Sequence, residues 1–80
     1  MASLLERALE YHQEGRLGEA ESVYREVLRG QPRNPDALHL LGVLRFQLGR
    51  PREALEAIEA AIRINAGIAP FHNNLGIVLG

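Results

Sequence analysis

Apolar side chains recur along the chain with the spacing of one face of a helix. One stripe follows the spacing i, i+3, i+4, i+7, i+8 and consists of Ala20, Val23, Tyr24, Val27 and Leu28. The same spacing returns 34 residues later in Ala54, Ala57, Ile58, Ala61 and Ile62. Such spacing is typical of an amphipathic α-helix with one buried side. Because no segment alternates between apolar and polar residues, we predict an all-α protein without strands.

The same period of 34 residues appears in identical residues. A shift by 34 superposes Leu4, Gln13, Gly15, Arg16, Glu19, Ala20 and Arg29 on Leu38, Gln47, Gly49, Arg50, Glu53, Ala54 and Arg63. A third copy begins where Leu41-Gly42 returns as Leu75-Gly76. A repeated helical unit of this length predicts copies that stack and bury a continuous core between them.

Capping residues, glycines and prolines set the predicted helix boundaries. Ser3 and Glu6 form a capping box, and Gly15 provides a left-handed stop. Asn34 is an N-cap that precedes a proline at the first helical position. The predicted helices run from about Leu4 to the stop at Gly15, Gly18 to Arg29, Pro35 to Leu48, Pro51 to Ile64, and Ala69 to the end of the chain. Because all connections are short, we expect antiparallel helical hairpins.

Two amphipathic helices per 34 residues resemble the tetratricopeptide repeat. The residues at the family's pattern positions are Leu4, Arg7-Ala8, Tyr11, Ala20, Tyr24 and Pro32 in the first copy, Leu38, Leu41-Gly42, Arg45, Ala54, Ile58 and Ala66 in the second, and His72, Leu75-Gly76 and Leu79 in the partial third. Arg7 stands where the later copies have Leu, and Ala66 replaces the proline. The resemblance implies an α-solenoid of five helices. It also implies one domain over residues 1–80, with full repeats at 1–34 and 35–68 and a partial repeat at 69–80.

Small residues at the pattern's crossing positions predict close contact between paired helices. Ala8, Gly42 and Gly76, together with Ala20 and Ala54, would let helix backbones approach where a larger side chain would clash. A glycine inside a helix costs about 1 kcal/mol relative to alanine, so its recurrence favours a packing role. The chain departs from the pattern before the fifth helix, where Ile68 stands in place of a capping residue such as Asn34.

The resemblance also implies a concave groove lined by the first helix of each hairpin, which in this family usually holds a peptide or helix of another protein. The corresponding positions are Leu5, Glu6, Leu9, His12 and Gln13, then His39, Leu40, Val43, Phe46 and Gln47, then Asn73, Asn74 and Ile77. This set is apolar with a few neutral polar groups, which fits a helix-in-groove mode of binding. The leucines and valines of the third helix have an alternative role as core residues.

Two more specific ligand classes follow from the family. The Lys, Arg and Asn clamp of members that bind chaperone tails is missing, because Leu5, Leu9, Leu40, Pro70 and Asn74 stand there. We therefore reject that ligand class. Asn74 in the run Phe-His-Asn-Asn-Leu-Gly resembles the groove asparagine of O-linked N-acetylglucosamine transferases. One alternative is therefore that the chain is a substrate-docking segment of a longer transferase.

The fifth helix carries apolar residues that have no following helix in the sequence. We predict that the chain self-associates as a homo-oligomer through Leu75, Val78 and Leu79, or that it is a piece of a longer array. Terminal units of a repeat stack usually carry a polar outer face, and this helix does not. A further alternative is a purely structural oligomerising unit without a ligand.

Charge and residue content argue against several other functions. Nine Arg and ten acidic residues give a formal charge of −1, so we expect no nucleic-acid or membrane partner. The chain has no Cys, Lys or Thr, and its histidines occupy unrelated repeat positions. We expect a non-enzymatic protein without catalytic residues, metal, cofactor or small-molecule substrate. Without an export signal, we expect it in the cytoplasm.

Overall fold

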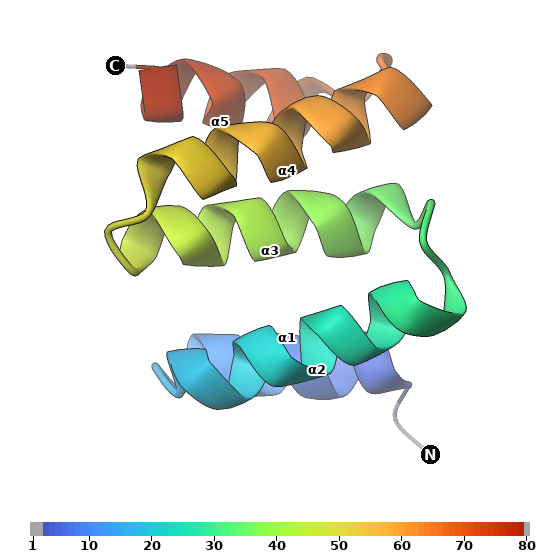
Figure 1. Cartoon of the computed structure of the whole chain (residues 1–80), viewed down its shortest axis with the longest axis vertical. Helices are drawn as coiled ribbons and strands as arrows, with labels where there is room; N and C mark the ends of the chain where they lie inside the picture. The colour runs from blue at the N-terminus through green and yellow to red at the C-terminus, as the bar shows by residue number, and fades with distance from the viewer. Residues whose placement is uncertain (1–2, 80) are drawn as a thin grey trace.

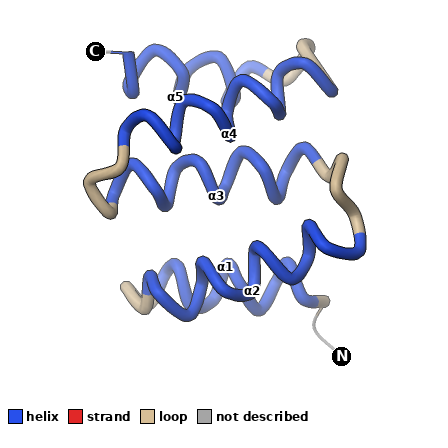
Figure 2. The backbone as a smooth tube through the Cα atoms, viewed as in Figure 1, coloured by secondary structure: helices blue, strands red, loops and turns tan. Residues whose placement is uncertain are grey.

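A computed structural model describes residues 3–79, which form five helices and, within that range, no strand (Figure 2). The helices are α1 (Leu4–Gln13), α2 (Leu17–Gly30), α3 (Pro35–Gln47), α4 (Pro51–Ile64) and α5 (Ala69–Leu79). Successive helices run back and forth and stack along the long axis, with the α1–α2 hairpin at one end and α5 at the other (Figure 1). The predicted all-α fold of stacked hairpins is confirmed.

Local signals place the helix ends where the sequence predicts them. The Ser3 hydroxyl accepts a hydrogen bond from the Glu6 backbone N–H at 3.1 Å, and the Asn34 carboxamide oxygen accepts one from Ala37, also at 3.1 Å. Gly15 and Gly49 adopt φ angles of 79° and 78°, the left-handed conformation that glycine accommodates without a steric penalty. Ser3 and Asn34 thus each accept a hydrogen bond from a backbone N–H that has no partner inside its helix. Gly15 and Gly49 turn the chain away from the helices that precede them.

Helix α2 is one residue longer than predicted at each end, because it begins at Leu17 and includes Gly30 as its last residue, and α3 ends at Gln47, one residue before the predicted Leu48. Gly30 does not take the left-handed conformation expected of a stop. The first residue outside the helix is Gln31, whose φ of −136° and ψ of 73° are not helical. Gln31 precedes Pro32, and the residue before a proline is pushed out of the helical region by the proline ring.

The central crossing joins α3 to α4 at Gly42. A Cβ atom at this position would lie 2.6 Å from Cγ1 of Ile58 and 3.0 Å from the backbone oxygen of Ala54. Both neighbours are fully buried, so neither has free space to move into. The predicted packing role of Gly42 is confirmed.

The sequence predicts the same close packing of helices at Gly76, and within residues 3–79 this prediction is wrong. Apart from its chain neighbours and the nearby backbone of its own helix, no heavy atom of the described residues lies within 4 Å of the position that a Cβ of Gly76 would take. Gly76 therefore lies on a side of α5 that none of residues 3–79 covers closely.

The first hairpin and α3 share a buried core. Its fully or nearly fully buried residues are Ala8, Ala20, Tyr24, Leu41 and Leu44. On the surface, Glu21 of α2 also joins this hairpin to the next one. Its Oε2 atom lies 3.7 Å from Nε of Arg45 on α3 and 3.1 Å from Nη1 of Arg50, which precedes α4.

Helix α5 begins at Ala69 as predicted, although Ile68 cannot cap it with a side chain. Polar groups organise the preceding turn instead. The Asn65 carboxamide oxygen accepts a hydrogen bond from the Gly67 N–H at 3.3 Å, and His72 Nε2 donates to the Ala66 carbonyl at 2.7 Å. Phe71 then anchors the helix, because its ring is buried against the rest of the molecule.

Candidate functional site

A depression lies between α3 and α5 and has a volume of about 210 Å³. It is lined by Val43, Phe46 and Gln47 of α3, Ile58 of α4, and Asn74, Ile77 and Val78 of α5. Phe46 is 39% exposed and Ile77 is 55% exposed, although both are large apolar side chains. The depression thus combines solvent-exposed apolar surface with two carboxamides, and we call it the α3–α5 depression.

A hydrogen bond between His39 and Asn74 holds α3 and α5 together beside this depression. The Asn74 carboxamide nitrogen lies 2.6 Å from Nε2 of His39, so the amide donates and the neutral imidazole accepts. The His39 ring also packs on Phe71, with ring centroids 4.4 Å apart. Burial of His39 lowers its pKa, against the smaller opposing effect of the Asp36 carboxylate. The neutral form that this hydrogen bond requires is therefore favoured.

A second histidine links α1 to α3. His12 Nδ1 lies 2.9 Å from the hydroxyl of Tyr24, and its Nε2 bonds to the carboxamide oxygen of Gln47. Burial raises the pKa of Tyr24 to about 12, so its hydroxyl keeps its proton and donates to Nδ1. The other ring nitrogen of His12 then carries the hydrogen that Gln47 accepts. We refer to the His12–Gln47 and His39–Asn74 interactions as the histidine–carboxamide links.

Neither link was predicted from the sequence, because the histidines occupy unrelated positions in the repeats. In each link a histidine pairs with a carboxamide 35 residues further along the chain, from His12 to Gln47 and from His39 to Asn74. The separation is one residue longer than the sequence repeat. Polar pairs separated by one repeat plus one residue are the signal in the sequence that indicates them.

The structure brings part of the predicted groove together. Val43, Phe46, Gln47, Asn74 and Ile77 share the α3–α5 depression. Leu5 of α1 and Leu40 of α3 instead pack against the core of the first hairpin, and the position of Leu40 matches the alternative core role of the third helix. Outside the depression, Leu9 is half-buried, whereas Glu6, Gln13 and Asn73 are exposed. His39 is buried and reaches the depression only through its partner Asn74.

The residues predicted for self-association differ in exposure. Leu79 is 66% exposed, and Leu75 and Val78 are half-buried. Together with Ile77 and the uncovered side of Gly76, they leave much of α5 accessible.

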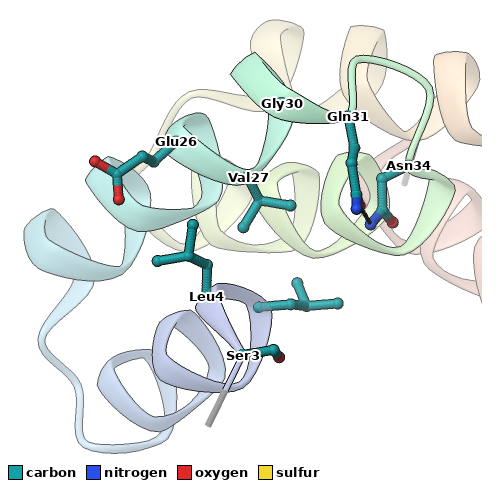
Figure 3. Close-up of a pocket in the computed structure, with 8 residues that line it drawn as sticks. Ser3, Leu4, Glu26, Val27, Gly30, Gln31 and Asn34 are labelled. Carbon is teal, nitrogen blue, oxygen red and sulfur yellow. Dashed lines mark hydrogen bonds between the residues drawn. The ribbon is translucent and has the colours of Figure 1, made fainter. Parts of the chain in front are cut away.

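A larger cavity of about 450 Å³ lies where α1 begins and α2 ends (Figure 3). Leu4 and Val27 point into the space between the two helices, whereas Glu26 points away from it (Figure 3). Two polar side chains of this cavity serve as helix caps. Ser3 caps α1, and Asn34 caps α3 while its carboxamide nitrogen donates to Gln31 at 2.8 Å. The capping oxygens of Ser3 and Asn34 are therefore already engaged within the chain.

Neither a cluster of metal ligands nor a membrane-spanning helix occurs in the described part of the chain. Among residues 3–79 there is no group of three or more His, Asp or Glu side chains placed to hold a metal ion. None of the helices described is both long enough and apolar enough to cross a bilayer.

Comparison with known proteins identifies the repeat. A family model with the description "Tetratricopeptide repeat" matches residues 11–72, which is more than half of the chain. No curated protein matches the chain significantly, so the resemblance to transferase repeats stays a prediction. Repeats of this kind generally mediate protein–protein interaction, and domains built from them are typically non-catalytic. The sequence match and the stacked helical hairpins together show that the chain belongs to the tetratricopeptide repeat family.

Proposed function

We propose that the chain is a non-catalytic module that binds an apolar peptide or helix of a partner protein in the α3–α5 depression. The observation that carries the proposal is the exposure of Phe46 of α3 and Ile77 of α5, which both line the depression. Large apolar side chains are normally buried, and exposed clusters of them typically mark interaction surfaces.

The size of the depression suits one apolar anchor. A volume of 210 Å³ corresponds to about seven water molecules of liquid. An apolar side chain that displaces this water removes its own surface, and that of Phe46 and Ile77, from solvent. Burial of apolar surface contributes roughly 25 cal/mol per Å². This gain supplies the driving force for binding.

The two carboxamides of the depression would orient the partner. Gln47 uses its oxygen to bond His12, and Asn74 uses its nitrogen to bond His39. The Gln47 nitrogen and the Asn74 oxygen are therefore left to pair with groups of a ligand. The Gln47 nitrogen would donate to a carbonyl of an extended peptide backbone, and the Asn74 oxygen would accept from a backbone N–H. On a helical partner, polar side chains would take these places.

Selection of peptides from a random phage-displayed library tests this proposal even though the natural partner is unidentified. We expect enriched peptides to share an apolar anchor and to bind the purified chain with a measurable Kd. Phe46→Asp should weaken their binding by at least about tenfold, because it places a charge beside the buried anchor.

The matched control is Glu59→Gln, an exposed position of α4 outside the depression. It should leave the Kd unchanged. Peptides that bind Phe46→Asp as tightly as the parent chain, with both proteins folded by circular dichroism, would place the binding surface elsewhere and contradict the proposal.

A second candidate function is self-association through α5. The exposure of Ile77 and Leu79, together with the uncovered side of Gly76, favours it. Helix α3 has a glycine at the same repeat position, and α4 packs directly on it. A helix of a second copy would find the same close approach at Gly76. Sedimentation equilibrium at micromolar concentration tests this idea, and a well-folded monomer would count against it.

A further inference from the structure

A second apolar cleft lies where α2, α3 and α4 meet, and it shares no residue with the α3–α5 depression. Its volume is about 460 Å³. Leu28 of α2 and Leu38 of α3 are half-buried in its wall, so apolar surface remains accessible to a ligand. We call this site the arginine cleft, because three arginines line it: Arg25, Arg29 and Arg45.

The charges around this cleft are unbalanced. Arg25 and Arg29 are four residues apart on α2, which places their exposed side chains on one face of the helix. Neither makes an ion pair with any of residues 3–79. Glu56 is the single acidic residue among those that line the cleft. Three guanidinium groups therefore surround a cleft that contains one carboxylate.

Arg45 is only weakly paired inside the chain. Its Nε atom is buried and has no hydrogen-bond partner within the described residues. The nearest carboxylate oxygen, Oε2 of Glu21, lies 3.7 Å away and is closer to Arg50. Within the described residues the Arg45 guanidinium thus has one ion pair, at 3.7 Å, and the side chain is 23% exposed, so its charge can still attract a carboxylate brought into the cleft.

We propose that the arginine cleft binds an acidic amphipathic segment of a partner protein. Two carboxylates four residues apart on a helix would meet Arg25 and Arg29, which have the same spacing. An apolar side chain between them would cover Leu28 and Leu38. The apolar wall favours a protein segment over a nucleic-acid backbone, since a phosphate chain would leave Leu28 and Leu38 uncovered. The cleft also lacks an aromatic lining residue on which bases could stack.

A pair of synthetic helical peptides tests the proposal on the whole chain. Both carry the same apolar residues, and one has Glu at positions i and i+4 where the other has Gln. Fluorescence anisotropy should show saturable binding of the Glu peptide, with the Gln peptide at least about tenfold weaker. Binding of the Glu peptide should weaken as salt rises from about 50 to about 300 mM, because exposed ion pairs are screened.

Variants of the chain then locate the binding. The double variant Arg25→Gln with Arg29→Gln should weaken binding of the Glu peptide at least about fivefold. The matched control, Arg52→Gln with Arg63→Gln, removes two exposed arginines of α4 that do not line the cleft and should leave the Kd unchanged. The double variant Arg25→Glu with Arg29→Glu should instead prefer a peptide with Lys in place of Glu.

Three results would overturn the proposal: no saturable binding of the Glu peptide, equal weakening by the two Arg→Gln variants, or more effective displacement by a single-stranded oligonucleotide. The variant Phe46→Asp separates this site from the proposed function, because it should leave Glu-peptide binding intact. Failure of either proposal is therefore recognisable without reference to the other.

Discussion

Gly42 shows how one residue determines the distance between two helices. Its missing side chain lets the α4 backbone approach until Ala54 and Ile58 occupy the space of a Cβ atom. Gly76 occupies the same repeat position without such a neighbour. The pair therefore provides a natural comparison between a glycine required by packing and one that is not.

We predict opposite effects of alanine at these two glycines. Gly42→Ala should lower the free energy of unfolding by about 1–2 kcal/mol, because overpacking outweighs the gain in helix propensity. Gly76→Ala should raise it by up to about 1 kcal/mol, because the new methyl group meets nothing. Urea unfolding followed by circular dichroism measures both changes. A stabilised Gly42→Ala variant would show that the crossing tolerates a wider separation.

His39 makes part of the stability dependent on pH. Burial lowers its pKa in the folded chain, so the folded state binds fewer protons than the unfolded state near the unfolded pKa of about 6.5. Its contribution is therefore present in full above about pH 6.5 and declines as the pH falls below that value. We expect the urea midpoint of the parent chain to fall more between about pH 7.5 and about pH 5.5 than that of His39→Gln. Equal falls would contradict this assignment.

At the scale of the helix, the termini were predictable because their causes are local. Ser3, Gly15, Asn34 and Gly49 each act within a few residues of their own position, so the sequence alone places them. Helix α3 was harder, because it is apolar on nearly every side. The sequence therefore could not show which of its residues face a groove and which pack inward. The structure places Leu40 against the first core and Phe46 at the α3–α5 depression.

The cap of α3 carries a testable share of the stability. Asn34 accepts the Ala37 N–H, and its carboxamide nitrogen donates to Gln31. Asn34→Ala removes both interactions and should cost about 0.5–2 kcal/mol in chemical unfolding. Asn34→Asp is the matched control, because it keeps the capping oxygen, and it should cost less. An unchanged midpoint for Asn34→Ala would mean that Pro35 alone suffices to start the helix.

At the scale of the whole molecule, the sequence predicted the stack but not the polar contacts that cross it. The 34-residue period identifies equivalent helices, and helices at equivalent positions pack in equivalent ways. The histidine–carboxamide links join residues that are not equivalent in the repeat, so the period hides them. The arginine cleft was hidden for a similar reason, since Arg45 comes from a different helix than Arg25 and Arg29.

If the chain associates through α5, its apparent stability depends on concentration. Oligomers gain stability by mass action, so the melting temperature should rise with protein concentration. Leu79→Glu places a charge on a large apolar residue of α5 that is 66% exposed, and it should remove this dependence while leaving the folded chain intact. Glu59→Lys changes an exposed residue of α4 and serves as the control. A melting temperature independent of concentration in the parent chain would argue against association.

The buried His39 also distinguishes correct from incorrect neighbours in the stack. The apolar stripes of α2 and α4 are so alike that they offer little discrimination between correct and shuffled neighbours. His39 is buried and finds its carboxamide on α5, so a wrong neighbour would leave the imidazole without a partner and away from water. The exposed His12–Gln47 interaction carries no such penalty, because water can replace the missing partner. During folding, the His39–Asn74 link would therefore disfavour exchanged hairpins that the repeated stripes alone would accept.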